Sequence, residues 1–231
     1  MLIRDIIQTH IIDDLDNRLN VLEVSAVTND LQDVMVCNIK WIKLYGFFMI
    51  GEQAYVVQSI SGRTITVEIA EGADPVTLNS DVRINKPLLF DGTLSNTRVE
   101  WAKYSDSERD KLPFIWLVSP TETNTANDNG QQLATAILKL CFIHWSDWTK
   151  LNADRQNEAV RPLYALYKEF MNTINRNTHI FEGYDNVSDR DFPKLGVLGA
   201  NGVEKTVFDS TLSAIEVDLN LNIFKRCCDF C

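Results

Sequence analysis

The sequence predicts an α+β protein: a mixed or antiparallel sheet flanked by two amphipathic helices, with a small β-rich insert. Three patterns in the 231 residues carry this prediction. Residues 212–224 alternate strictly between apolar and polar side chains, which is typical of a half-buried strand. Residues 3–18 and 153–175 repeat apolar side chains at helical spacing. Residues 37–85 are dense in β-forming residues and turn signals.

The closing strand is the clearest element. Its apolar side chains are Ile215, Val217, Leu219, Leu221 and Ile223. Its polar side chains are Glu216, Asp218, Asn220 and Asn222. A period of two places these sets on opposite faces, one buried and one wet. The wet face carries acids and amides only, which is typical of a scaffold strand and suggests no chemistry by itself.

The two helices follow from their apolar stripes. The first stripe consists of Ile3, Ile6, Ile7, Ile11 and Leu15. The second consists of Val160, Leu163, Leu166, Tyr167, Phe170, Met171 and Ile174, with Pro162 near its start. Spacings of three and four residues put each set on one face of a helix, which is then buried against the sheet.

The insert is predicted to be a short meander. Its expected strands are residues 21–27, which precede it, and residues 45–50, 55–60 and 63–69 within it. Gly51-Glu52 and Ser61-Gly62 supply the turns. The predicted organisation is therefore a core of residues 1–36 and 86–231, with residues 37–85 as a β-rich subdomain.

The second half of the chain mixes apolar and polar segments. We expect residues 86–110 to be irregular, residues 114–118 to be a strand between two prolines, and residues 133–145 to be a strand buried on both faces. The polar segment 120–132 fits a flexible finger that orders against a neighbouring subunit. Its candidate interface residues are Thr121, Glu122, Asn124, Asn127 and Asp128. Residues 195–198 and 203–208 are expected to form a hairpin.

Composition excludes several function classes. The net charge of −10 argues against a protein that grips a nucleic-acid backbone, although an acidic channel could let a duplex slide. We expect no membrane-spanning helix and no secretory signal, since no long apolar run is present and charge interrupts the N-terminal apolar stretch. Five cysteines fit a disulfide framework poorly and favour a reducing compartment.

We expect no catalytic residue and no enzyme activity. The three histidines have no metal-binding or catalytic spacing, and no nucleophile-elbow or phosphate-loop motif is present. Asp185, Asp189 and Asp191 could serve a hydrolase or hold a hard cation, but Arg190 is an easier partner for these carboxylates. A solvated loop is the favoured interpretation.

The C-terminal cysteines suggest an alternative of another class. Cys228 and Cys231 have the spacing of a zinc-ligand pair, and Cys227 and Cys37 are the other zinc candidates. A small zinc-binding interaction module would use these four thiolates. A disulfide or free thiols are the other possibilities, and free thiols are favoured because chain ends fray.

The order of elements resembles that of the tail-terminator and neck-ring proteins of tailed bacteriophages. It is most similar to neck proteins of phages of Bacteroides-like hosts, including the crAss-like group. The similarity lies in residues 37–41 (CNIKW), 90–93 (FDGT), 112–120, 161–164 (RPLY) and 212–221.

This resemblance implies a non-enzymatic structural protein of the virion, without a cofactor. Such proteins form homo-oligomeric rings that join the portal and connector region to the tail, and DNA passes through the ring without sequence-specific binding. Assembly would take place in the cytoplasm of the host bacterium. A head-tail connector or adaptor ring is the alternative within the class, because the β-rich segment and the cysteine tail depart from the simplest terminators.

Overall fold

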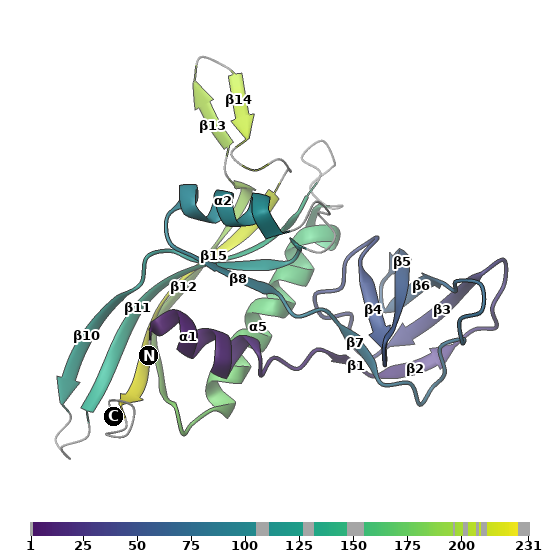
Figure 1. Cartoon of the computed structure of the whole chain (residues 1–231), viewed down its shortest axis with the longest axis horizontal. Helices are drawn as coiled ribbons and strands as arrows, with labels where there is room; N and C mark the ends of the chain where they lie inside the picture. The colour runs from purple at the N-terminus through teal and green to yellow at the C-terminus, as the bar shows by residue number, and fades with distance from the viewer. Residues whose placement is uncertain are drawn as a thin grey trace. The chain divides into compact units, whose positions relative to one another are not determined.

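The computed structural model divides into two compact units, which are described separately (Figure 1). The larger unit comprises Met1–Leu15 and Pro87–Cys231, and the smaller unit comprises Asp16–Lys86. The structure describes residues 2–104, 111–126, 132–146, 155–195, 197–200, 203–206, 208 and 212–225.

A mixed sheet forms the centre of the larger unit. Its strands are β8 (Leu88–Asp91), β9 (Phe114–Leu117), β10 (Thr121–Ala126), β11 (Gln132–Trp145), β12 (Phe181–Leu195) and β15 (Leu212–Lys225). The order is β12-β15-β11-β9-β8, and β10 pairs with β11 beyond the end of β9. Within the described ranges only β8 and β9 run parallel; the other neighbours are antiparallel. The predicted α+β class with a mixed sheet is confirmed.

Two helical segments of this unit contact each other, and Asn177 at the end of the second donates to the carbonyl of His10 in the first. The first is α1 (Ile3–Ile7), continued by the π-helical turn η1 (Gln8–Ile12). The second is η2 (Gln156–Val160), continued by α5 (Arg161–Arg176). Phe142 of β11 packs against the rings of Tyr167 and Phe170, so the apolar stripe of α5 faces the sheet as predicted. The first helical segment ends at Ile12 and is shorter than the sequence indicates.

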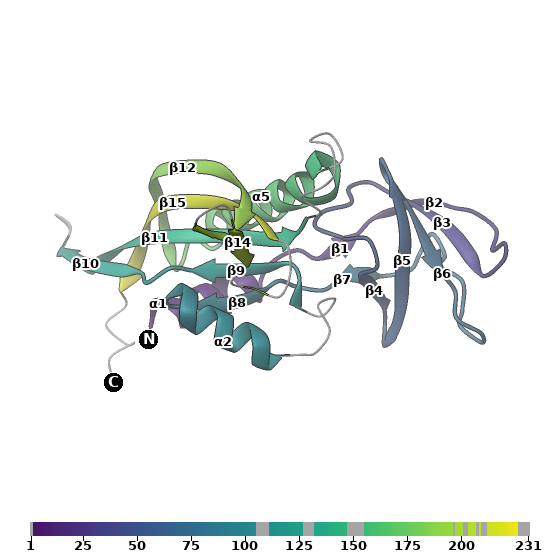
Figure 2. The same cartoon turned by 90° about the horizontal axis from the view of Figure 1, so that it is seen from above.

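A further helix, α2 (Leu94–Tyr104), connects the parallel strands β8 and β9 (Figure 2). Trp101 of α2 packs on Phe114 and Phe208, in a cluster that also contains Cys141 and Ile143. The expectation that residues 86–110 are irregular is therefore wrong for the described part. The helix is hard to see in the sequence because Thr97 and Trp101 are its only fully buried residues.

Two other strand predictions need correction. Residues 121–126 of the predicted finger form strand β10, because their backbone pairs with β11 in six consecutive registers. Strand β11 is buried on both faces only near its end: Cys141 and Ile143 lie under α2, but Ile137 is 49% exposed. The predicted hairpin is present as β13 (Val197–Ala200) and β14 (Val203–Thr206), but its first strand lies two residues later than predicted.

The smaller unit is a single antiparallel sheet. Its strands are β1 (Arg18–Leu19), β2 (Val21–Val24), β3 (Leu31–Val36), β4 (Phe47–Ile50), β5 (Gln53–Ser61), β6 (Thr64–Glu68) and β7 (Val82–Ile84). Their order is β1-β7-β4-β5-β6-β3-β2. The unit starts at Asp16 rather than at residue 37, because β1, β2 and β3 hydrogen-bond into the same sheet.

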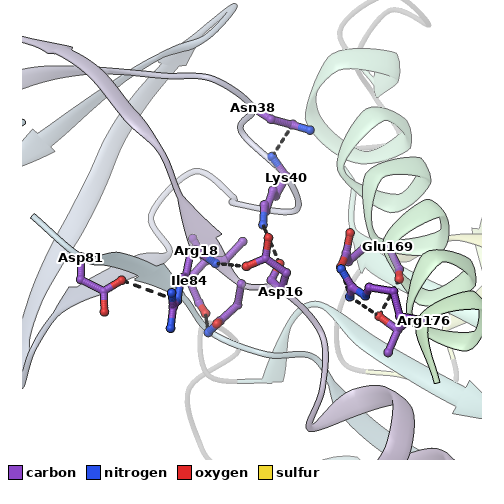
Figure 3. A network of polar contacts seen from close by, with 10 residues as sticks. Asp16, Arg18, Asn38, Lys40, Asp81, Ile84, Glu169 and Arg176 are labelled. Carbon is purple, nitrogen blue, oxygen red and sulfur yellow. Dashed lines mark hydrogen bonds and ion pairs between the residues drawn. The ribbon is translucent and has the colours of Figure 1, made fainter. Parts of the chain in front are cut away.

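Polar contacts fasten the entry and exit of the smaller unit. Lys40 Nζ lies 2.7 Å from Asp16 Oδ2 and also donates to the Asp16 carbonyl at 2.6 Å (Figure 3). Asn17 Nδ2 donates to the carbonyl of Ile84 at 2.6 Å. The two ends of this unit are thus held side by side, which suits a domain inserted into another domain.

Candidate functional site

The polar residues of β15 lie on a part of the larger sheet that no described helix covers. Helix α2 packs over Leu212 and Ala214, at the start of β15, and leaves the later even-numbered residues free of a covering layer. The register places Asp218 opposite Lys139, Asn220 opposite Ile137 and Asn222 opposite Thr135. We call this surface the open face. It comprises Thr121, Thr135, Ile137, Lys139, Asp185, Arg190, Glu216, Asp218, Asn220 and Asn222.

Charged side chains from three strands meet at the centre of the open face. Glu216 is the most enclosed of them, with a side chain that is 12% exposed. Its Oε1 lies 2.6 Å from Nη2 of Arg190 on β12 and 3.2 Å from Nζ of Lys139 on β11. Lys139 also lies 3.6 Å from Asp218 Oδ1. The hydrogen bond from Lys139 to Glu216 is the main cause of a raised pKa for Lys139.

A shallow hollow of about 310 Å³ lies over this charged cluster. Its lining residues are Lys139, Ser188, Asp189, Arg190, Glu216 and Asp218, but the Asp189 carboxylate accepts a hydrogen bond from Tyr164 of α5. Both cations that border the hollow are already paired with carboxylates. The hollow is therefore poorly suited to capture phosphate or another anion.

The remainder of the open face is held by amide and hydroxyl groups. Thr135 Oγ1 donates to Asn222 Oδ1 at 2.9 Å, and Asn222 Nδ2 donates to Asp185 Oδ2 at 3.0 Å. These bonds again connect β11, β15 and β12. Two cations, Lys139 and Arg190, against three carboxylates, Asp185, Glu216 and Asp218, give the face a formal charge of −1.

The structure brings together five of the sequence-predicted residues and separates others. Glu216, Asp218, Asn220, Asn222 and Thr121 share the open face, as their pairing partners show. Glu122 does not, because it pairs with Ala136, whose side chain is buried on the opposite side. The backbone of Asn124 pairs with Ala134. Asn127 and Asp128 lie outside the described residues.

Five residues of the open face were not predicted to lie there, and three of them, Lys139, Asp185 and Arg190, are charged. Lys139 is the one Lys, Arg, Asp or Glu within β11, and a single such charge in a mostly apolar strand is a usable signal for an exposed position. Arg190 and Asp185 gave no such signal, because the strand that carries them was not predicted.

The carboxylates Asp185, Asp189 and Asp191 do not converge. Asp185 pairs with Asn220 on the open face, whereas Asp189 and Asp191 pair with Val217 and Ile215, which face the other way. Tyr164 donates its hydroxyl to Asp189 Oδ2 at 2.9 Å.

Asp191 and Arg190, which belong to the same segment, each form an ion pair with another residue. Arg155 Nη2 lies 2.6 Å from Asp191 Oδ2. Arg190 pairs with Glu216 rather than with its acidic neighbours, which corrects the sequence-based expectation. Within the described residues no group of three or more His, Cys, Asp or Glu side chains could hold a metal ion.

The predicted zinc ligands are described only in part. Cys37 is an exposed free thiol of the smaller unit, and Cys227, Cys228 and Cys231 lie outside the described residues. Cys141 is buried under α2, and burial raises its pKa to about 12. It is therefore a protonated core thiol at neutral pH.

Two comparisons with known proteins found no match. No protein-family model matches the sequence, and no curated protein matches it significantly. Across the described residues, no helix has the length and apolar character needed to span a bilayer.

Proposed function

We propose that this chain is a structural protein of a phage virion that forms a homo-oligomeric, tail-terminator-like ring in the neck. The ring joins the head and its connector to the tail and lets DNA pass. The open face is the observation that carries the proposal. It is a polar sheet surface whose Lys139 and Arg190 are both neutralised by carboxylates of the same sheet.

Such a surface suits a DNA passage for an electrostatic reason. Phosphate binding requires Lys or Arg groups that are free to replace counterions. On the open face the cations are paired and the formal charge is −1, so a duplex is neither gripped nor strongly repelled. The net charge of −10 for the whole chain supports the same view.

The test is to measure the oligomeric state and DNA binding of the purified chain. Sedimentation velocity should show a discrete oligomer, alone or after mixing with connector or tail proteins. An electrophoretic assay at physiological salt should show no retardation of duplex DNA. Protein that stays strictly monomeric with and without its virion neighbours would overturn the proposal. Whether the ring binds the connector protein or the tail protein distinguishes an adaptor from a terminator.

A further inference from the structure

A second hollow of the larger unit lies between helix α5 and the edge strand β12, and we call it the α5–β12 groove. Its volume is about 390 Å³. Its aromatic and apolar lining residues are Tyr167, Met171, Tyr184 and Val187. Its polar lining residues are Lys168, Asn172 and Asn175. Tyrosine, methionine and asparagine are side chains that protein-binding surfaces favour, so a polypeptide segment is the occupant that this groove suits.

Lys168 gives the groove its charge. Among the described residues it is the one charged side chain in the lining, and no described side chain pairs with its ammonium group. The two cations of the open face, in contrast, are both bound by a carboxylate. An ammonium group beside apolar side chains favours a partner that has a carboxylate next to an apolar side chain.

The groove lies at one edge of the sheet and on the side away from the open face. Strand β12 is the first strand in the order β12-β15-β11-β9-β8. Tyr184 pairs with Leu221, whose neighbours Asn220 and Asn222 belong to the open face. Side chains alternate along a strand, so the Tyr184 side chain lies on the other side of the sheet. A copy that meets the sheet at this groove therefore leaves the open face uncovered.

The start of α1 has the complementary features. Leu2, its N-cap residue, is 72% exposed, which is the largest exposed fraction of the large apolar side chains in the described part. The Asp5 carboxylate lies beside it, because Asp5 Oδ2 accepts a hydrogen bond from the Leu2 N–H at 3.3 Å. No described cation pairs with Asp5. An exposed leucine and a carboxylate without a cation are therefore neighbours on this segment.

This segment lies at the other end of the strand order. Arg4 Nε lies 2.9 Å from Asp91 Oδ1, so the start of α1 is beside β8, the last strand of the sheet. Figure 2 shows α1 on the β8 side and β12 at the opposite edge. Complementary surfaces at two ends of one sheet allow a head-to-tail contact, which closes into a ring when the rotation between copies permits.

We infer that the start of α1 in one copy docks in the α5–β12 groove of the next copy. This inference rests on the proposed ring and identifies a contact that builds it. Leu2 packs against Tyr167 and Met171, and Asp5 pairs with Lys168. Lys168 follows Tyr167 directly and precedes Met171 by three residues, so the charge of the groove lies next to its apolar surface, as on the docking segment.

Charge reversal tests the ion pair in sedimentation velocity. Lys168→Glu places like charges at the contact, and we expect the dissociation constant of the oligomer to rise at least about tenfold. Lys103→Glu is the matched control, because it makes the same change in net charge at an exposed lysine of α2. The double variant Asp5→Lys with Lys168→Glu restores the pair with exchanged charges, so it should assemble more tightly than either single variant.

Removal of the exposed leucine tests the apolar part of the contact. Leu2→Ser should weaken assembly and leave the melting temperature of the monomer unchanged, because the side chain is mostly in solvent. Leu78→Ser is the matched control, since Leu78 is 55% exposed in the smaller unit. We expect Leu78→Ser to assemble like the wild type.

The outcomes separate the contact from the ring. A wild-type chain that assembles, together with Lys168→Glu and Leu2→Ser variants that assemble equally well, would overturn the contact and leave the ring proposal standing. A double variant no tighter than its single variants would overturn the docking of α1, because another segment would then occupy the groove. A wild-type chain that never assembles, alone or with its virion neighbours, would overturn both.

Discussion

Arg190 and Glu216 form the shortest ion pair on the open face, with Nη2 and Oε1 2.6 Å apart. The pair joins the edge strand β12 to β15, and Lys139 adds β11 through the same carboxylate oxygen at 3.2 Å. A single acidic side chain therefore links three adjacent strands and pairs with both cations of the face. These closed ion pairs are the reason why we propose that a sheet surface with Lys139 and Arg190 does not bind phosphate.

Glu216→Gln should convert this indifference into weak DNA binding. The change keeps the shape of the side chain and frees part of the charge of Lys139 and Arg190, so the face becomes more positive by one charge per copy. We expect salt-dependent retardation of duplex DNA at low ionic strength, weakening as salt rises. The free energy of unfolding should fall by about 1–2 kcal/mol, since charge-assisted hydrogen bonds are lost.

Asp218→Asn provides the control for Glu216→Gln. Its carboxylate is 51% exposed and lies 3.6 Å from Lys139, so its removal leaves the Arg190 pair in place. We expect a smaller effect on DNA binding and no measurable effect on stability. Equal DNA binding by both variants would show that total charge, and not the paired cluster, controls the interaction.

Arg155→Ala should weaken the attachment of η2 to the edge strand. The guanidinium donates to both carboxylate oxygens of Asp191, at 3.2 and 2.6 Å, and its side chain is only 12% exposed. Loss of this bidentate pair should cost about 1–2 kcal/mol in urea unfolding. Asp81→Asn removes an exposed ion pair with Arg83 and should leave the unfolding curve unchanged. A greater loss in Asp81→Asn than in Arg155→Ala would contradict this ranking.

Cys141 should make the protein less stable in alkali. Burial, and then the charge of Glu216, raise the pKa of Cys141 from 9.0 to about 12. Its stabilising contribution is complete below pH 9 and is lost as the pH rises through 12, because the unfolded chain releases the proton first. The slope for one proton is about 1.4 kcal/mol per pH unit.

Cys141→Ala isolates this effect, because all other titrating groups are shared with the wild type. Urea unfolding between pH 8 and 11 should show a shallower decline for the variant, despite a roughly constant loss of about 1 kcal/mol from the smaller side chain. Parallel declines in the two proteins would show that Cys141 ionises as readily in the folded state as in the unfolded chain.

Cys37 should react with iodoacetamide in the native protein, and Cys141 only after unfolding. Cys37 is exposed and Cys141 is buried with a raised pKa, so access and thiolate content both favour Cys37. Peptide mass spectrometry of the labelled chain measures both rates. Protection of Cys37 that a chelator abolishes, together with stoichiometric zinc in the purified protein, would favour the zinc-binding module instead.

The parts of the fold that were predictable are those with one buried face. The closing strand was predicted correctly because Val217 and Leu219 are buried while Asp218 between them is half-exposed. The stripe of α5 was predicted for the same reason. In both cases the sequence of apolar and polar residues follows the burial pattern that the tertiary structure imposes.

Two of the strands that escaped prediction, β10 and β12, are exposed edge strands. Strand β12 has exposed residues from Asp185 to Lys194, so it lacks the alternation that marks a strand. Strand β10 has the sequence TETNTA, which is polar at every position but the last, and it is ordered by its ladder with β11. Strands β10 and β12 are ordered by pairing with β11 and β15, and β12 is far from β15 in the sequence. A local sequence pattern therefore does not reveal this pairing. Hence the acidic half of the open face was predicted, and its basic partner Arg190 was not.

Electron microscopy of the assembled chain tests the central proposal most directly. We predict annular particles with a central hole, in which the larger unit turns Glu216, Asp218, Asn220 and Asn222 toward the lumen. Solid particles, or rings whose open face is buried between subunits or turned outward, would contradict a DNA passage lined by this surface.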